Sequence, residues 1–398
     1  MAQALWERQA MFYNRLNRRN LLAAAAMAAL AGCAVVPKAP APAPAPAPTP
    51  TAPESEIPTD TERHRVALLV PISGPNAGVG QSLANAANMA LLDTGAKNLR
   101  ITTYDTGTNP GEAARRAIAD GNKLILGPLL SDDIASVAAV AKPAHVPLIS
   151  FSNDEKAAGK DVFIIGNLPG QSIARTVGYA RGKGISTFAA LVPKGDYGER
   201  VSSSLLASVR DSGGSVVAME TYDRTAASIG AAANRIKAKS GYGALLIADS
   251  GSLSAKAAVS YRAAGGGAGV RLLGTELWGG ERELATSPAL NGAWFSTVSD
   301  VRFAQFSKSY RSRFGAAPFR IATLGYDAVL LTLRVTRAWV PGKAFPTGEM
   351  LDPGGFLGMD GPFRFNRNGL IERALEVRAV DGGAIKVISA APSGFAKD

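Results

Sequence analysis

Hydroxyl side chains follow two apolar runs of the chain, residues 124–126 and 146–151. Ser131 opens a helix-like segment after the first run, and Ser150 and Ser152 lie at the end of the second. In a right-handed strand–helix–strand unit both loops lie at the carboxyl ends of parallel strands, so these hydroxyls should converge on one edge of a sheet. We therefore expect this edge to bind a small polar ligand.

Motifs for covalent or metal chemistry are missing from the sequence. It contains no G-x-S-x-G, S-x-x-K or G-x-x-x-x-G-K-[ST] pattern, and His64 and His145 fall outside the expected site loops. The single cysteine, Cys33, cannot form an intramolecular disulfide. Two histidines and one thiol cannot complete a Cys/His zinc site, although an all-carboxylate site is left open. We expect a protein that is not an enzyme and needs no metal or cofactor.

A glycine-containing loop follows the first predicted strand of the folded body. Gly74, Gly78 and Gly80 are spaced G-x-x-x-G-x-G, which is not the G-x-G-x-x-G of dinucleotide sites, although Asp105 lies where a ribose ligand would. Two interpretations remain open. The glycines permit a tight turn, or the loop presents backbone amides at a helix N-terminus to a bound ligand.

The composition favours a large α/β protein. The chain has 398 residues, 46% of them hydrophobic, with few aromatics (7%) and 43 glycines, which suits helices packed closely on sheets. The formal net charge of +11 includes no run of five basic residues. It therefore predicts a solvated basic surface or an anionic partner such as the cell wall or a lipid surface, and no nucleic-acid binding.

The first 64 residues predict export and anchoring. Residues 1–32 have a basic start and a short apolar core, which is typical of a signal peptide, with Met1 or Met11 as the start. Their end, with Cys33, resembles the bacterial lipoprotein box, so we expect a lipidated Cys33. The paired arginines Arg18 and Arg19 also faintly resemble a twin-arginine signal. Residues 33–64 form a Pro/Ala-rich tether.

Strand and helix patterns alternate through the rest of the chain and restart near residue 168. This predicts an α/β fold with two doubly wound parallel-sheet lobes joined by hinge crossovers. We expect residues 65–167 and 300–340 in lobe 1 and residues 168–299 in lobe 2. A strand over 293–299 should cross back to lobe 1. The turn-rich segment 341–398 fits either lobe.

The body resembles the type I periplasmic binding proteins of the branched-chain amino-acid (Leu/Ile/Val) receptor kind. The motifs that carry the resemblance are Gly74-Pro75, Asp105 with Pro110, Leu126-Gly127-Pro128 with Ser131, Val146-Pro147-Leu148-Ile149-Ser150, Asp196-Tyr197-Gly198, Gly325-Tyr326-Asp327-Ala328 and the glycines and phenylalanines of 358–369. The resemblance implies two lobes joined by three crossovers, closing on a ligand without covalent chemistry.

The same resemblance implies roles for five residues. Ser131 would donate to a ligand carboxylate, or else cap its own helix. Ser150 and Ser152 would line lobe 1, or else serve as turn residues. Tyr197 would close over the ligand from lobe 2, or else be exposed, and Glu276 would meet an α-ammonium group, or else form structural hydrogen bonds.

Two functions fit this resemblance. One is an envelope receptor that passes an amino acid-like solute to an ABC permease. The other resembles the outer-membrane lipoproteins that activate penicillin-binding proteins, because Ala34 follows the expected anchor and the tether is long. Both place the protein on the periplasmic side of the envelope, at the outer membrane rather than the inner. A hydrolase, the third class, has only unassigned serines to support it.

Overall fold

The structure is a computed structural model that describes residues 62–395. The expected signal segment, Cys33 and the tether up to residue 61 lie outside the described residues. Within 62–395, we find no helix with the length and apolar character that a membrane span needs.

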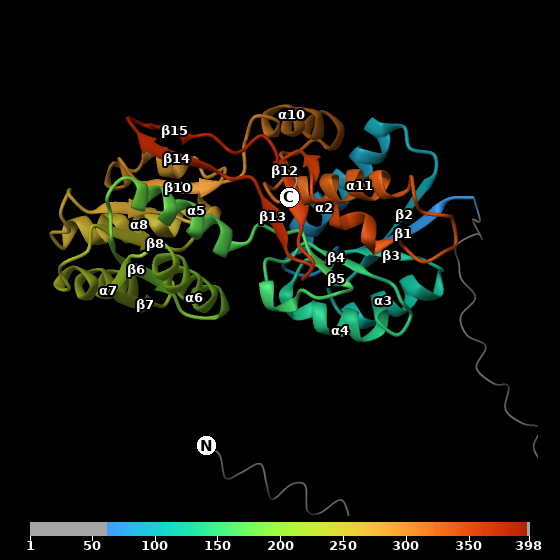
Figure 1. Cartoon of the computed structure of the whole chain (residues 1–398), viewed down its shortest axis with the longest axis horizontal. Helices are drawn as coiled ribbons and strands as arrows, with labels where there is room; N and C mark the ends of the chain where they lie inside the picture. Colours follow the sequence, from blue (N-terminus) through green and yellow to red (C-terminus); the bar gives the residue numbers. More distant parts are fainter. Residues whose placement is uncertain (1–61, 396–398) are drawn as a thin grey trace, which may run out of the picture. The chain divides into compact units, whose positions relative to one another are not determined.

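A five-stranded parallel sheet forms the centre of lobe 1, in the order β2-β1-β3-β4-β5. Strands β1, β3, β4 and β5 are largely apolar and mostly buried because helices cover both faces, whereas the edge strand β2 is more polar and partly exposed. In Figure 1, α3 and α4 lie along one face of this sheet, and α2 and α11 lie along the other. The elements are β1 (His64–Val70), α2 (Ala77–Thr94), β2 (Leu99–Asp105), α3 (Pro110–Ala119), β3 (Leu124–Leu126), α4 (Ser131–Ala141), β4 (Leu148–Ser150), η1 (Glu155–Ala157), β5 (Val162–Ile164) and α11 (Ala322–Val335).

A seven-stranded sheet forms the centre of lobe 2, in the order β15-β14-β10-β9-β8-β6-β7. One core packs α5 and α6 against one face of the sheet, and a second core packs α7 and α8 against the other. The elements are α5 (Pro169–Gly182), β6 (Thr187–Pro193), α6 (Asp196–Asp211), β7 (Ser215–Tyr222), α7 (Ala226–Ala238), β8 (Ala244–Ile247), α8 (Gly251–Ala263), β9 (Arg271–Leu273), η2 (Glu276–Trp278), α9 (Glu283–Thr286), η3 (Pro288–Leu290), β10 (Trp294–Thr297), β14 (Glu376–Asp381) and β15 (Ala384–Ser389).

The second sheet contains the expected parallel strands β10-β9-β8-β6-β7 and adds two antiparallel strands at one edge, which were not expected. β14 pairs antiparallel with both β10 and β15. The pair β14–β15 is a hairpin whose turn residues Gly382 and Gly383 have φ of 57° and 81°, and such a tight turn joins only antiparallel strands. The strand expected to cross back, β10, stays in the second sheet, and the crossover follows it.

The C-terminal segment divides between the two lobes. Its three-stranded antiparallel sheet packs into the core of lobe 1 through Phe363, Phe365 and Ile371, whereas β14 and β15 extend lobe 2. α10 packs beside α2. The remaining elements are α10 (Phe303–Phe314), η4 (Thr347–Leu351), β11 (Phe356–Gly358), β12 (Gly361–Phe365) and β13 (Ile371–Arg373).

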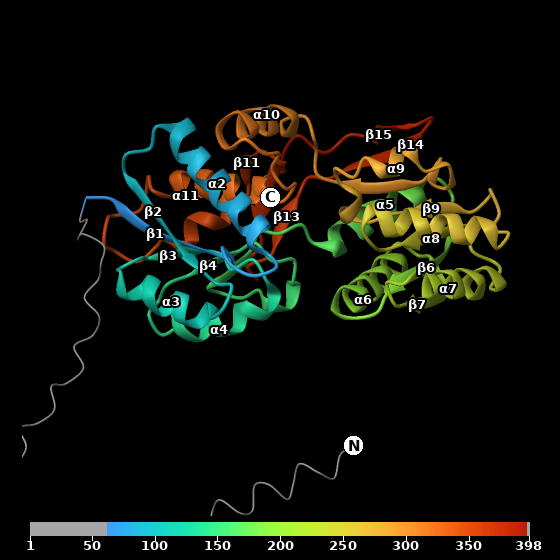
Figure 2. The ribbon, with the colours of Figure 1, turned by 180° about the vertical axis from the view of Figure 1, so that it is seen from behind.

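Three segments of the described chain run between the lobes, at 165–168, 298–302 and 374–375. Figure 2 shows from behind how β13 leads into β14 and how β5 leads toward α5. These crossovers place the loops after β4 and β5 next to the first turns of α5 and α6, where the candidate site lies.

Candidate functional site

The serines at the end of β4 form hydrogen bonds with neighbouring backbone groups. Ser150 is fully buried, and its hydroxyl donates to the Pro128 carbonyl at 2.8 Å and accepts from the Ser152 backbone N–H at 3.2 Å. The Ser152 hydroxyl accepts from the backbone N–H of Asp154 at 3.1 Å. These contacts are those expected of strand-end turn residues, and a ligand role for Ser150 and Ser152 stays a prediction.

Ser131 is the first helical residue of α4 and does not cap it. The N-cap position is Leu130, which makes no side-chain capping bond, and the Ser131 hydroxyl donates to the Asp132 carboxylate at 3.3 Å. The capping alternative for Ser131 is therefore wrong, because its backbone already has the helical conformation. Asp132 and Asp133 make this corner acidic, and burial and then the charge of Asp132 raise the pKa of Asp133.

Tyr197 and Glu276 meet inside lobe 2. The Tyr197 hydroxyl lies 2.9 Å from Thr275 Oγ1 and donates to Glu276 Oε1 at 3.1 Å. Tyr197 lies in the first turn of α6, and Glu276 begins η2 after β9, so the carboxyl ends of two strands of one sheet bring them together. Both residues were predicted as ligand contacts, and the structure makes them neighbours.

Glu276 has an incomplete set of hydrogen bonds. Its Oε2 is buried without a hydrogen-bond partner. Burial raises the pKa of Glu276 to about 7, opposed by hydrogen bonds from its own backbone N–H and from Tyr197. It lines a cavity of about 10 Å³, room for one water molecule, together with Asn167, Thr297, Arg373 and other side chains. An uncompensated carboxylate oxygen in such a place is poised to receive a donor.

Three residues that the sequence did not single out lie beside this pair. Arg200, one turn after Tyr197 on α6, has its Nη1 3.9 Å from Asp154 Oδ1 of lobe 1. Glu155, next in the chain, feels the charge of Arg200, and both charges act on Glu276. We call Asp154, Glu155, Tyr197, Arg200 and Glu276 the junction cluster. The sequence did contain clues to these three residues. Arg200 is three positions after Tyr197 on the same helix, and Asp154 and Glu155 directly follow the predicted serine loop.

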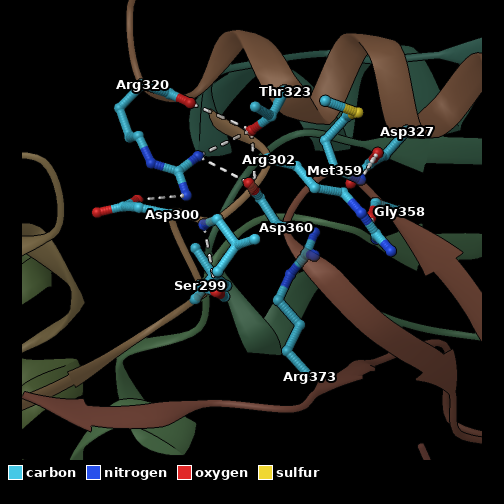
Figure 3. Close-up of polar contacts among 12 residues, drawn as sticks. Ser299, Asp300, Arg302, Arg320, Thr323, Asp327, Gly358, Met359, Asp360 and Arg373 are labelled. Atoms are coloured by element: carbon cyan, nitrogen blue, oxygen red, sulfur yellow. Dashed lines mark hydrogen bonds and ion pairs between the residues drawn. The ribbon is translucent and has the colours of Figure 1, made fainter. Parts of the chain in front are cut away.

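A second polar cluster joins the lobes at the crossovers (Figure 3). Asp300, which follows β10, pairs with Arg320 of lobe 1 at 3.3 Å. It also pairs with Arg378 of β14. Arg320 pairs in turn with the fully buried Asp360 at 2.7 Å, and Asp360 also accepts from Thr323 at 2.9 Å. We call Asp300, Arg320, Asp360 and Arg378 the crossover cluster.

Two further charged groups are buried close to the crossover cluster. Asp327 accepts from the Met359 backbone N–H at 2.6 Å, and Arg373 donates to the Ile165 carbonyl at 2.7 Å. Burial and then the charge of Asp360 raise the pKa of Asp327, while Arg373 opposes the shift. Charges therefore join the two lobes at the crossovers as well as at the junction cluster.

The contacts of the glycine loop are those of a tight turn. The Asp105 carboxylate accepts from the backbone N–H groups of Ile72, Ser73 and Gly107 at 2.7, 3.2 and 2.8 Å. Although partial burial raises it, hydrogen bonds lower the pKa of Asp105 to about 2. A Cβ at Gly80 would lie 1.8 Å from the Pro71 carbonyl oxygen. The tight-turn interpretation therefore accounts for Asp105 and Gly80, and in residues 62–395 no group of three or more His, Cys, Asp or Glu could hold a metal ion.

A family model described as periplasmic binding protein matches residues 64–381. A curated relative, the uncharacterised protein RP748 of Rickettsia prowazekii, is 31% identical over 139 residues, which cover 34% of this chain and 37% of that protein. The matched part thus spans little more than a third of the curated relative.

Solved structures show the same fold at low identity. A putative branched-chain amino acid ABC transporter protein from Rhodospirillum rubrum aligns with a TM-score of 0.70 and 20% identity, over 82% of this chain and 100% of that one. The LivJ substrate-binding protein of Streptococcus pneumoniae, in complex with isoleucine, aligns at 0.63 and 18%, over 83% and 100%. A solute-binding protein of R. palustris, in complex with benzoate, aligns at 0.64 and 21%, over 84% and 98%.

Proposed function

Because the chain belongs to the periplasmic binding protein family, we propose that it is a non-catalytic receptor that captures a small polar ligand between its two lobes. We further propose that the ligand is amino acid-like and that an ABC-type permease receives it. Two of the similar structures are complexes with isoleucine and with benzoate, which supports a carboxylate-bearing solute.

The observation that carries this proposal is the Tyr197–Glu276 pair. A Glu276 carboxylate that is held by Tyr197 through one oxygen, with the other oxygen buried and unpaired, is a preorganised acceptor for an ammonium group. Its position next to Asp154 and Glu155 of lobe 1 would let a ligand touch both lobes. A ligand that binds the closed form better than the open form shifts the population toward closure.

The test is a thermal-shift screen of the chain against amino acids and aromatic carboxylates, followed by calorimetry of each hit. We expect at least one hit, which Glu276→Ala weakens about 10- to 100-fold, because a lost charge-assisted hydrogen bond costs roughly 1.5–3 kcal/mol. Ser131→Ala tests the other predicted contact. The control is Glu283→Ala, an exposed acid of the same lobe. Unchanged affinity in both Glu276→Ala and Ser131→Ala would remove the site.

A second function is favoured by one observation, namely that acidic side chains of lobe 1 already occupy the junction with lobe 2. A cleft closed by its own side chains suits a regulator, so the alternative is an outer-membrane activator of a penicillin-binding protein. It predicts saturable binding to that synthase and faster glycan polymerisation or crosslinking in a reconstituted assay. No acceleration in that assay would count against it.

Anchoring through lipidated Cys33 is part of both proposals. We expect the chain to fractionate with membranes on the periplasmic side, at the outer membrane, and Cys33→Ala to release it. A Cys33→Ala variant that stays in the membrane fraction would contradict the anchor. Separation of the two membranes by density would show which one holds the protein.

A further inference from the structure

Segment η1 carries two acidic side chains of lobe 1 to the helices of lobe 2. It follows the turn made by Ser152, and Asp154 caps it by accepting from the Lys156 backbone N–H at 3.1 Å. Asp154 and Glu155 are thereby presented to α5 and α6, whose first turns face the lobe junction.

Glu155 places its carboxylate against the amino end of α5. Its Oε1 lies 2.8 Å from the position that a Cβ would take at Gly170, and Ser204 Oγ of α6 lies 3.2 Å from the same position. Burial raises the pKa of Glu155, while the Gly170 backbone N–H and the charge of Arg200 oppose this shift. Free N–H groups and the dipole at the start of a 14-residue helix favour a negative charge there.

Arg200 lacks a close carboxylate partner. Its Nε is buried without a hydrogen bond, and its ion pair with Asp154 is long at 3.9 Å. Asp154 is held back by its cap bond to η1. A guanidinium prefers two parallel hydrogen bonds to one carboxylate, so Arg200 has unused capacity for an anionic group.

The position predicted for a ligand carboxylate, Ser131, is less suited to an anion. Its hydroxyl is already hydrogen-bonded to Asp132, and Asp133 lies in the same turn with a buried, unpaired Oδ2. Asp132 and Asp133 would repel a ligand carboxylate that is bound at Ser131. Positive potential at the junction comes from Arg200, from the start of α5 and from Arg373, which lines the same cavity as Glu276.

We propose that Arg200 and the amino end of α5 form the carboxylate subsite of the ligand site, and that Glu155 occupies this subsite as a tethered competitor until a ligand carboxylate displaces it. The inference rests on the proposed receptor function and deepens it. It assigns the ligand carboxylate to lobe 2 and makes Glu155 a determinant of affinity. With Glu276 as the ammonium acceptor, the ligand class is a small molecule with one carboxylate and one amino group.

The test supplies a free carboxylate where the tethered one has been removed. We measure the Tm of wild type, Glu155→Ala and Glu155→Ala/Arg200→Met in sodium acetate up to about 100 mM, a concentration at which even a millimolar ligand stabilises measurably. Sodium chloride at the same ionic strength and neutral acetamide are the controls. Glu155→Ser replaces the alanine variant should that one fail to fold.

We expect acetate to raise the Tm of Glu155→Ala by several degrees and that of wild type much less, because wild type holds its own carboxylate in the subsite. Arg200→Met should abolish the effect. An equal shift in all three proteins, a shift that survives Arg200→Met, or no shift in Glu155→Ala would overturn the proposal.

Ligand affinity gives an independent readout once a hit is known. Removal of a competitor that fills the subsite nine-tenths of the time should tighten binding about tenfold, so we expect this gain for Glu155→Gln and a loss for Arg200→Met. Tightening by Glu155→Gln without weakening by Arg200→Met would reject the subsite. If acetate stabilises Glu155→Ala but the ligand screen yields no hit, the receptor function is contradicted and the subsite is kept. If the screen yields hits but acetate has no effect, the subsite is contradicted and the receptor function is kept.

Discussion

The two polar clusters that join the lobes are built from the same residue types but differ in how closely the arginine approaches its acids. In the crossover cluster, Arg320 has Asp360 at 2.7 Å and Asp300 at 3.3 Å. In the junction cluster, the arginine Arg200 has only a 3.9 Å contact to Asp154. Arg320 has two acids within 3.3 Å, although its own Nε and Nη2 also make no hydrogen bond, whereas the acid paired with Arg200 lies 3.9 Å away.

This difference predicts a structural role for the crossover cluster and a binding role for the junction cluster. Removing one partner of a buried ion pair, such as that of Asp360 with Arg320, is strongly destabilising because the remaining charge is left buried and uncompensated. The junction cluster is loosely paired and leaves Glu276 Oε2 without a partner, so a ligand can complete it. We expect substitutions in the crossover cluster to lower stability and those in the junction cluster to change binding.

The largest effect is expected from Asp360→Asn. It removes the carboxylate charge that faces Arg320 in a fully buried position, which should lower the free energy of unfolding by about 3–5 kcal/mol. Urea denaturation measures this. The matched control is Asp381→Asn, whose ion pair with Lys386 is more than half exposed on both sides and should contribute at most about 1 kcal/mol. Equal losses in the two variants would erase the distinction between buried and exposed pairs.

A pH-dependent effect of intermediate size is expected from Glu276→Gln. The pKa of Glu276 is raised from 4.5 to about 7 in the folded protein, so the folded state holds the proton more tightly and loses stability as pH rises between these values. The variant should therefore gain stability over wild type between pH 5 and pH 8, by up to about 3 kcal/mol. Thermal unfolding at both pH values checks this, and a gain independent of pH would contradict the burial of an ionising Glu276.

A smaller stability effect is expected from Arg200→Met. Its one ion pair is long and its Nε is unpaired, so the free energy of unfolding should fall by about 1 kcal/mol or less. The same change at Arg320 should cost several times more, because Asp360 and Asp300 would both lose their partner. If the two arginine variants unfold at the same urea concentration, the two clusters are not different in kind.

The smallest effect is expected from Ser131→Ala. Because Leu130 and not Ser131 is the N-cap of α4, the substitution should change the free energy of unfolding by less than about 0.5 kcal/mol. Ser250→Ala is the comparison, since Ser250 does cap α8 by accepting from the Leu253 backbone N–H at 3.5 Å. Its loss should cost about 1 kcal/mol. A larger loss at Ser131 would show that its hydroxyl stabilises the helix start after all.

Much of the fold could be predicted because its strands are unbroken apolar runs. β1 (His64–Val70) and β6 (Thr187–Pro193) are buried on both faces, so their sequences show burial directly. The antiparallel addition of β14 could not be predicted in the same way. Its residues Glu376 and Arg378 are buried and charged because they pair with each other, and such pairing is a tertiary property.

The candidate site was predicted only in part, for the same reason. Tyr197 and Glu276 lie 79 positions apart and meet because parallel strands end at one edge, a rule that sequence patterns can use. The ion pair of Arg200 with Asp154 and its charge effect on Glu155 depend on how lobe 1 faces lobe 2, which no local pattern encodes. The sequence also does not reveal that the Ser150 hydroxyl donates to the Pro128 carbonyl.

The central claim is that one ligand completes the junction cluster. Native mass spectrometry of the chain after incubation with a metabolite extract tests it most directly, with Glu276→Ala, Arg200→Met and Glu283→Ala in parallel. The account predicts that one small species with a carboxylate and an amino group stays bound to wild type and Glu283→Ala and is lost from the other two. No retained species, or equal retention by all four proteins, would contradict it.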